Sequence, residues 1–277
     1  MRATAELHDG RRLGYAEWGP ADGTPVLGFL GTSLSSLAHL GADAPRAAGV
    51  RLVLVDRPGY GRSDHQPGRT LLDWPADVAE LADALAIERF AVFGMSGGGP
   101  YAAACGYALP DRVSTVGLVS SPGPVWDRPE LRYSLPPHRQ PLVELAKRDR
   151  GAAARRLLED CREQLEEARR EPGDGGVADL DLRKRLNAAL LETAARGPEG
   201  YAHDLLVLFV SPWGFAPEQI SVPTGIWHGD RDPAVPLAVA EFFARAIPDS
   251  SLTVVRGDGH LVLWTRAEEI LAALVSR

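Results

Sequence analysis

The chain of 277 residues contains only two cysteines, Cys105 and Cys161, which lie far apart and form no Cys-x-x-Cys motif. This scarcity argues against a disulfide framework and against a cysteine-based zinc site. No stretch approaches 18 consecutive apolar residues, and residues 1–6 lack the apolar run of a secretory signal. We therefore expect no membrane partner and a cytoplasmic location.

The chain also has fewer basic than acidic residues. The chain has 30 Lys and Arg against 37 Asp and Glu, a net charge of −7, and shows no basic stripe with interleaved aromatic residues. This pattern gives no support to nucleic-acid binding. Glycine clusters near residues 28–31 and 94–99 form neither G-x-G-x-x-G nor a P-loop with lysine, so no nucleotide cofactor is expected.

Strand and helix patterns alternate at both ends of the chain. Residues Arg11–Trp18 alternate enough between apolar and polar to predict an edge strand. Strand patterns also occur at Pro25–Leu30, Arg51–Val55, Phe90–Phe93, Val113–Ser120, Thr224–His228 and Ser251–Val255, and the first three are short apolar runs typical of strands buried on both faces. Segments with helical spacing occur at Ser36–Ala48, Asp73–Ala86, Pro100–Leu109, Leu237–Ile247 and Ala267–Val275. This order predicts an α/β fold with a mostly parallel sheet of about eight strands and helices on both faces.

Residues 124–217 differ in composition from the rest. They include 15 basic and 16 acidic residues, about a third of the segment. Apolar residues recur there at helical spacing, for example at Leu182, Leu186 and Leu190. The glycine-rich run at 171–176 predicts a break between two helices. We expect a helical insert that rests on a core made of residues 1–123 and 218–277.

The strongest chemical signal is Gly94-Met95-Ser96-Gly97-Gly98, which matches G-x-S-x-G. It follows a predicted strand and precedes a predicted helix, which is where a sharp turn exposes a nucleophilic serine. Small residues on both sides permit such a turn, and the N–H of Gly97 would then face a developing oxyanion. The motif predicts Ser96 as a nucleophile, and the alternative is an inert glycine-rich turn.

A serine nucleophile needs a base, and the base needs an orienting acid. His260 follows the last predicted strand and is flanked by glycine, which suits the base. Asp232, after the preceding strand and three residues beyond Gly229, is favoured as the acid, with Asp230 as the alternative. A metal site built from His228, Asp230 and Asp232 is not favoured, because adjacent positions at one strand end rarely converge on an ion.

Together these motifs resemble the α/β-hydrolase superfamily, in its serine-hydrolase branch with a helical cap. The matching stretches are Asp56–Ser63, Gly94–Pro100, Gly229–Pro236 and Gly257–His260. The run Gly97-Gly98-Gly99-Pro100 is similar to that of esterases, lactonases and proline-iminopeptidase-like enzymes. The resemblance implies a structural role for the Asp56–Ser63 loop beside the site, and a cap formed by residues 124–217.

One position departs from the family pattern. The family usually carries His-Gly after its third strand, whereas this chain has Leu30-Gly31-Thr32. The resemblance implies that the backbone N–H of Thr32 serves with that of Gly97 as an oxyanion donor, which does not depend on the side chain at position 30. The missing histidine normally supports this loop, so its absence bears on catalytic efficiency rather than on the fold.

The aromatic residues of the insert and of the C-terminal region have two interpretations. Together with Leu30 they could line a substrate pocket beneath the cap, or they could pack at the seam between cap and core. The residues in question are Trp126, Tyr133, Trp213, Phe215 and Trp264.

The sequence thus predicts a serine hydrolase that cleaves an ester, lactone or related acyl bond of a small molecule through an acyl-enzyme, without metal or cofactor. One alternative keeps the triad but is a lyase, perhydrolase or cyclase of small-molecule biosynthesis. Another is a ligand-binding protein with a vestigial triad, because one fold hosts many functions. The sequence leaves open whether the protein is a monomer or a homodimer.

Overall fold

The computed structural model describes residues 2–170 and 177–276. Within them lies an eight-stranded sheet with the order β1-β2-β4-β3-β5-β6-β7-β8, in which β1 and β2 are antiparallel and the strands from β4 to β8 are parallel. The strands are β1 (Arg2–Glu6), β2 (Arg12–Trp18), β3 (Thr24–Phe29), β4 (Val50–Val55), β5 (Phe90–Met95), β6 (Val113–Val119), β7 (Thr224–Gly229) and β8 (Ser250–Val255). The predicted fold class is confirmed.

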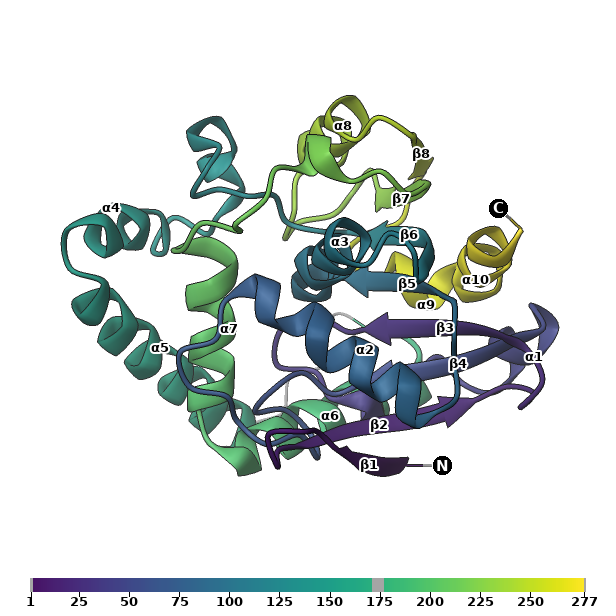
Figure 1. Ribbon diagram of the computed structural model, residues 1–277. Helices are drawn as coiled ribbons and strands as arrows, with labels where there is room; N and C mark the ends of the chain where they lie inside the picture. The colour runs from purple at the N-terminus through teal and green to yellow at the C-terminus, as the bar shows by residue number, and fades with distance from the viewer. Residues whose placement is uncertain (1, 171–176, 277) are drawn as a thin grey trace.

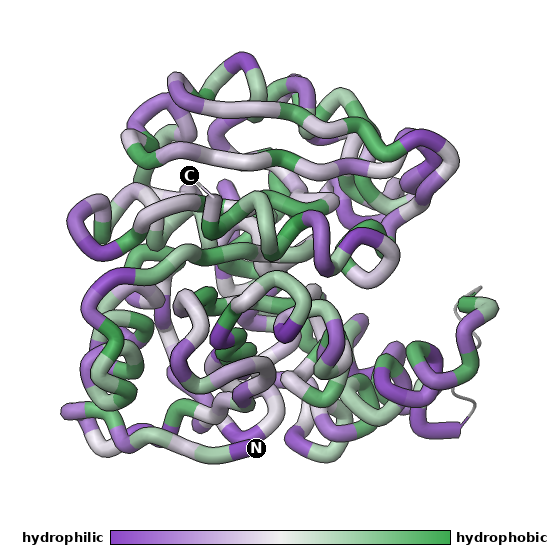
Figure 2. The backbone as a smooth tube through the Cα atoms, turned by 90° about the vertical axis from the view of Figure 1, so that its right-hand side faces the viewer, coloured by the Kyte–Doolittle hydropathy of each residue, from purple (hydrophilic) through white to green (hydrophobic). Residues whose placement is uncertain are grey.

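Helices cover both faces of this sheet (Figure 1). One face is covered by α2 (Trp74–Ala84), α3 (Gly99–Ala108) and α8 (Leu237–Ala246), and the other by α1 (Asp43–Ala47), α9 (Val262–Thr265) and α10 (Ala267–Val275). Successive side chains along a parallel strand point alternately toward the two layers of helices. In β4, for example, Val53 packs with the first set of helices and Leu54 with the second. Apolar residues are accordingly concentrated inside the fold and hydrophilic ones at its outer turns (Figure 2).

Two local predictions need correction. The helix expected over Ser36–Ala48 is split into a 3-10 turn, η1 (Ser36–Ala38), and the short α1. Gly41 between them has φ +86°, and the buried Asp56 carboxylate accepts the N–H of Ser36, so the backbone does not continue as one helix. Strand β1 is not predicted from the sequence, because its short sequence pairs only at the exposed edge of the sheet. The expected edge strand, β2, therefore lies inside the sheet, where it pairs with both β1 and β4. Among the described residues no helix is long and apolar enough to cross a bilayer.

Four helices lie between β6 and β7 in the chain: α4 (Gln140–Arg148), α5 (Arg150–Arg170), α6 (Leu180–Arg196) and α7 (Glu199–Phe209). Helices α4, α5 and α7 lie beyond the carboxyl ends of the parallel strands (Figure 1). The predicted helical content of the insert therefore agrees with the structure. Its boundaries at residues 124 and 217 stay a prediction, and the break predicted at 171–176 lies outside the described residues.

Helix α6 is held against the core by polar contacts. The guanidinium of Arg2 in β1 donates to both carboxylate oxygens of Glu192, at 2.9 and 2.7 Å. Ser35 donates to the same carboxylate at 2.6 Å, and Arg185 donates to the backbone oxygen of His39. Strand β1 and the loop after β3 thus fix the position of α6 over the end of the sheet.

Helix α7 approaches the loop after β4 so closely that side chains are excluded at the contact. A Cβ built on Gly200 would lie 2.7 Å from the carbonyl oxygen of Gly59, and one on Gly59 would lie 2.6 Å from the Cα of Gly200. Gly59 also has φ +87°, which favours glycine. The two glycines therefore set the distance between the insert and the core.

We expect Gly200→Ala to destabilise the protein by about 1–3 kcal/mol, because the added methyl group forces the two backbones apart. The matched control is Gly151→Ala, at the second position of α5, where a Cβ would lie 3.3 Å from two side-chain ends, Arg155 Nη1 and Asp149 Oδ1, and near no other backbone. There, higher helix propensity favours alanine by up to about 1 kcal/mol. Urea denaturation measures both free energies of unfolding, and equal values for the two variants would contradict the prediction.

Candidate active site

Ser96 lies at a sharp turn between strand β5 and helix α3. The 3-10 turn η3 (Ser96–Gly98) connects the two elements, and Ser96 has φ +50°, a conformation that residues other than glycine rarely adopt. Strained backbone of this kind is typical of functional sites. The structure thus has the strand, turn and helix that expose a serine side chain at the end of a parallel sheet.

The glycines around Ser96 are required by close backbone packing. A Cβ on Gly94 would lie 2.1 Å from the carbonyl oxygen of Gly98, and a Cβ on Gly98 would lie 2.0 Å from that of Phe29 at the end of β3. The turn therefore packs directly against the loop that follows β3. That loop carries Thr32, and Ser96 is fixed relative to it.

His260 and Asp232 form a hydrogen-bonded pair. The distance from His260 Nδ1 to Asp232 Oδ2 is 2.8 Å, and the His260 side chain is 23% exposed while that of Asp232 is fully buried. The other carboxylate oxygen, Oδ1, accepts the N–H groups of Ala234 at 2.8 Å and Val235 at 3.0 Å. The turn after β7 thus orients Asp232 toward the loop after β8.

Burial by itself would raise the pKa of Asp232. The hydrogen bonds from His260 and from the two backbone N–H groups outweigh burial, and the pKa of Asp232 lies below its usual value. The carboxylate is therefore ionised at neutral pH and can hold the His260 ring with its Nδ1–H toward Asp232.

Asp230 has a different position. Its Oδ1 accepts the N–H of Gly257 at 2.7 Å, which joins the turn after β7 to the loop that carries His260. His228 is fully buried below this turn, with Nε2 2.8 Å from the backbone oxygen of Val235 and 3.5 Å from Asp232 Oδ2. Of the two candidate acids, the structure places Asp232 beside His260. Among the described residues no cluster of His, Cys, Asp or Glu is arranged to hold a metal ion.

One cavity, of about 340 Å³, is bordered by three of the five predicted catalytic and oxyanion residues. It is lined by Ser96, His260, Thr32 and Gly31. The remaining wall is almost wholly aliphatic and comes from the core (Leu34, Met95, Leu261) and from the insert (Val177, Leu186, Asn187, Leu190). Sequence reasoning missed these insert residues as pocket residues, although the spacing of Leu182, Leu186 and Leu190 had indicated one helix face.

The two predicted oxyanion donors lie next to each other. A Cβ built on Gly97 would be 3.1 Å from the backbone nitrogen of Thr32 and 2.5 Å from its Cγ2. Both backbone segments border Ser96, one in the turn itself and one in the loop after β3. The arrangement can direct two N–H groups at an oxygen bound near Ser96.

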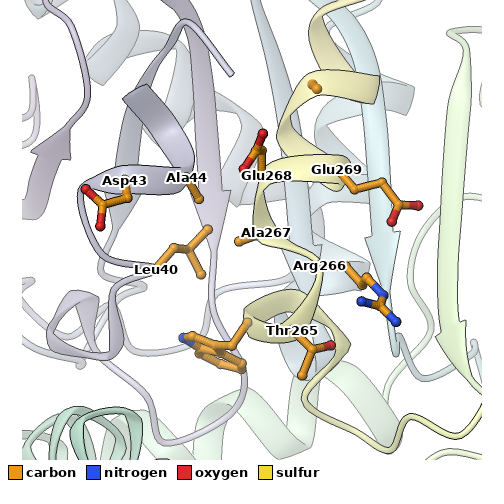
Figure 3. Close-up of a pocket in the computed structure, with 10 residues that line it drawn as sticks. Leu40, Asp43, Ala44, Thr265, Arg266, Ala267, Glu268 and Glu269 are labelled. Carbon is orange, nitrogen blue, oxygen red and sulfur yellow. The ribbon is translucent and has the colours of Figure 1, made fainter. Parts of the chain in front are cut away.

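None of the six predicted pocket residues is among those that line this cavity, so their positions favour the packing interpretation. Leu30 is buried in the core, and Trp213 is buried against Phe215 and Phe243. Tyr133 is 52% exposed, and the ammonium of Lys147 lies over the ring of Trp126. Trp264 borders a different cavity, between α1 and α10. Leu40 and Arg266 also line that cavity (Figure 3).

The α/β-hydrolase fold family model matches residues 26–267, from the third residue of β3 to the first residue of α10, and so includes strands β4 to β8 and the insert. The chain belongs to the α/β-hydrolase family. Its solved structural neighbours include an esterase from Exiguobacterium antarcticum (EaEST; TM-score 0.73, 21% identity, covering 100% of this chain and 98% of that one). An enol-lactonase from Burkholderia xenovorans LB400 aligns with TM-score 0.69 and 21% identity over 99% and 98% of the two chains. These likenesses show the shared fold.

Curated relatives in sequence include a non-heme chloroperoxidase of Streptomyces lividans, 37% identical over 135 residues, which are 44% of this chain and 45% of the relative. A 2-hydroxy-6-oxononadienedioate/2-hydroxy-6-oxononatrienedioate hydrolase of Cupriavidus pinatubonensis is 26% identical over 234 residues, 80% of this chain and 74% of the relative. The matches at 32–37% identity span less than half of the relatives' own length. This α/β-hydrolase family member therefore has hydrolases among its relatives at modest identity.

Proposed function

We propose that this α/β-hydrolase is a serine hydrolase that cleaves an ester or lactone of a small molecule. The observation that carries the proposal is the 2.8 Å contact between Asp232 and His260, with His260 and Ser96 lining one cavity. This is the order of groups that nucleophilic catalysis by serine requires. The insert serves as a cap, since residues of α6 supply one wall of that cavity.

In the proposed reaction, Ser96 Oγ forms a bond to the acyl carbon and its proton passes to His260 Nε2. The bond from the acyl carbon to the leaving oxygen then breaks, and that oxygen takes the proton from His260. Water attacks the acyl-enzyme, gives a proton to His260 and releases the acid, and the proton returns to Ser96. Asp232 keeps His260 in the required tautomer and stabilises its charged form, while the N–H groups of Thr32 and Gly97 bind the oxyanion.

The cavity wall indicates a neutral, apolar acyl group. Among its described residues are six aliphatic or thioether side chains and one amide, Asn187, and neither arginine nor lysine. A substrate carboxylate buried there would lack a cationic partner, which is costly. This differs from what a dioate substrate, as named for the Cupriavidus hydrolase, would require.

The test is labelling by a fluorophosphonate, with His260→Ala as the matched control, followed by a panel of p-nitrophenyl esters and lactones. We expect one adduct, located on Ser96 by peptide mass spectrometry, that forms at least tenfold more slowly in His260→Ala. Neutral acyl esters should then be hydrolysed faster than esters of the same length that end in a carboxylate. A folded protein that takes up no label and turns over no ester would contradict the proposal.

A second candidate is acyl transfer to hydrogen peroxide, favoured by the 37% identity to the non-heme chloroperoxidase. The same acyl-enzyme would form, and peroxide would replace water as the attacking nucleophile, so the product would be a peracid. Repeating the ester panel with added peroxide separates the two functions, because only the second yields a peracid as the main product.

A further inference from the structure

The loop after β3 is held by a buried guanidinium from the neighbouring strand. Arg57 follows β4, and its side chain is almost completely inaccessible to solvent. Its Nη1 donates to the carbonyl oxygen of Leu30, and its Nη2 donates to that of Gly31 at 3.0 Å. Two consecutive carbonyl groups of this loop are therefore bound by one planar side chain.

The second of these carbonyl groups belongs to the peptide unit that matters for the oxyanion. The C=O of Gly31 and the N–H of Thr32 are parts of the same planar peptide bond. A charged donor on the oxygen of a peptide group polarises it, which makes its N–H a stronger donor, as in hydrogen-bond chains. The contact also fixes the plane of the peptide and thereby the direction of the Thr32 N–H.

Arg57 is itself fixed by Asp204 of helix α7. Its Nη2 and Nε donate to Asp204 Oδ2 at 2.8 and 3.1 Å, and its guanidinium lies 4.9 Å from the Tyr60 ring centroid and 5.2 Å from that of Tyr101. The other oxygen, Oδ1, accepts from Tyr101 at 2.5 Å and from Arg69 at 2.8 Å. This planar, multiply bound geometry suits arginine and not lysine.

The cluster remains charged although it is buried. Burial would raise the pKa of Asp204, but Arg57 and Arg69 outweigh burial and lower it. Two guanidinium groups then face one carboxylate, so the cluster of these three groups carries a net positive charge beside the loop. A positive charge on that side favours the negative oxygen that forms at Thr32.

We propose that Arg57 is a positioning residue of the oxyanion hole: it orients the Gly31–Thr32 peptide and strengthens Thr32 N–H as a donor. The aliphatic side chain of Leu30 cannot form a hydrogen bond that supports the loop after β3. Arg57 supports this loop instead, through the carbonyl oxygens of Leu30 and Gly31. Through Asp204 the orientation of this peptide also depends on the docking of α7. The inference rests on the proposed function, since it assigns a supporting residue to that reaction.

Arg69 provides a matched control within the same cluster. It is as buried as Arg57 and donates to the same carboxylate, yet its guanidinium contacts Asp204 and Tyr101 and has no hydrogen bond to the loop after β3. Replacing either arginine by lysine disturbs one buried ion pair. Only the change at position 57 also removes the paired contacts with Leu30 and Gly31.

The experiment compares Arg57→Lys with Arg69→Lys for the best ester of the panel. Loss of a whole oxyanion donor costs about 10²–10³ in kcat. For a weakened donor we expect kcat of Arg57→Lys to fall about 10- to 100-fold with KM within about threefold, the pattern of an interaction made in the transition state. Arg69→Lys should stay within about threefold of wild type in both constants. Equal kcat values for the two folded variants would overturn the proposal.

A measurement that does not use activity accompanies the kinetics. In ¹⁵N,¹³C-labelled protein, the Gly31 carbonyl ¹³C signal should move to lower ppm and the Thr32 amide ¹⁵N signal should shift in Arg57→Lys, with both unchanged in Arg69→Lys. Unchanged signals in Arg57→Lys would overturn the placement. If Arg57→Lys does not fold, Arg57→Gln replaces it, and the same two signals are compared with those of the wild type and of Arg69→Lys. A wild-type protein inert to label and esters counts against the proposed function alone, because the NMR shifts still decide the placement of Arg57.

Discussion

Replacing Ser96 with alanine is expected to reduce ester turnover by at least about 10⁴-fold without loss of the fold. The change removes the attacking oxygen, and what remains is the binding and oxyanion contribution of the cavity. The backbone at this position is already left-handed, at φ +50°, and alanine carries a Cβ like serine, so the turn gains no new clash. Steady-state kinetics on purified protein, with circular dichroism as the check of folding, provide the measurement.

A suitable control is Ser120→Ala. Ser120 also has a left-handed backbone, at φ +46°, and follows the neighbouring parallel strand β6. It is fully buried, and it is not among the residues that line the cavity. We expect this variant to keep turnover within about threefold of wild type. Turnover by Ser96→Ala that matches Ser120→Ala would show that another group performs the chemistry.

Replacing Asp232 with asparagine is expected to lower kcat by about 10⁴-fold, the size of effect seen when the orienting acid of a serine triad loses its charge. An amide whose nitrogen faces His260 would make Nδ1 an acceptor and place the ring proton on Nε2. His260 could then no longer accept the proton of Ser96. The protein should still fold, because the Asn oxygen can continue to accept the N–H groups of Ala234 and Val235, which lie 2.8 and 3.0 Å from Asp232 Oδ1.

Asp230→Asn is the matched control, because it makes the same chemical change two residues earlier. Asp230 accepts the N–H of Gly257 at 2.7 Å, a hydrogen bond that an asparagine oxygen can retain. We expect kcat within about threefold of wild type. A large loss in Asp230→Asn together with a small one in Asp232→Asn would reverse the assignment of the orienting acid.

Features encoded in short segments could be predicted from the sequence. Helix α10 begins and ends at the predicted residues, Ala267 and Val275, since its apolar spacing is local. The turn around Ser96 could also be predicted from the sequence. Close backbone contacts require glycine at positions 94 and 98, and these glycines form a recognisable sequence motif. The division of Ser36–Ala48 into two short helices could not be predicted from that segment alone. It depends on a hydrogen bond to Asp56, which lies outside the segment.

The aromatic residues show that the sequence did not predict which side chains line the cavity. Trp213 and Trp264 are large aromatic side chains, and the sequence allowed either packing or a pocket for both. Trp213 is buried between other rings, while the cavity at Ser96 is walled by leucines of α6. Which face of a helix meets the site depends on how that helix docks. The contacts of α6 with Arg2 and Ser35, each more than 150 residues away in the chain, decide it.

The sequence by itself determined the α/β fold, the serine at a strand-to-helix turn and the later acid and histidine at successive strand ends, because each is specified by spacing within a short segment. Only the tertiary structure showed that Asp232 rather than Asp230 lies beside His260, that α6 closes the cavity and that Arg57 binds the loop after β3. These are contacts between segments far apart in the chain. Their geometry depends on how the whole molecule packs. The charged side chain of Arg57, for example, can be buried beside Leu30 only because the carboxylate of Asp204 pairs with it.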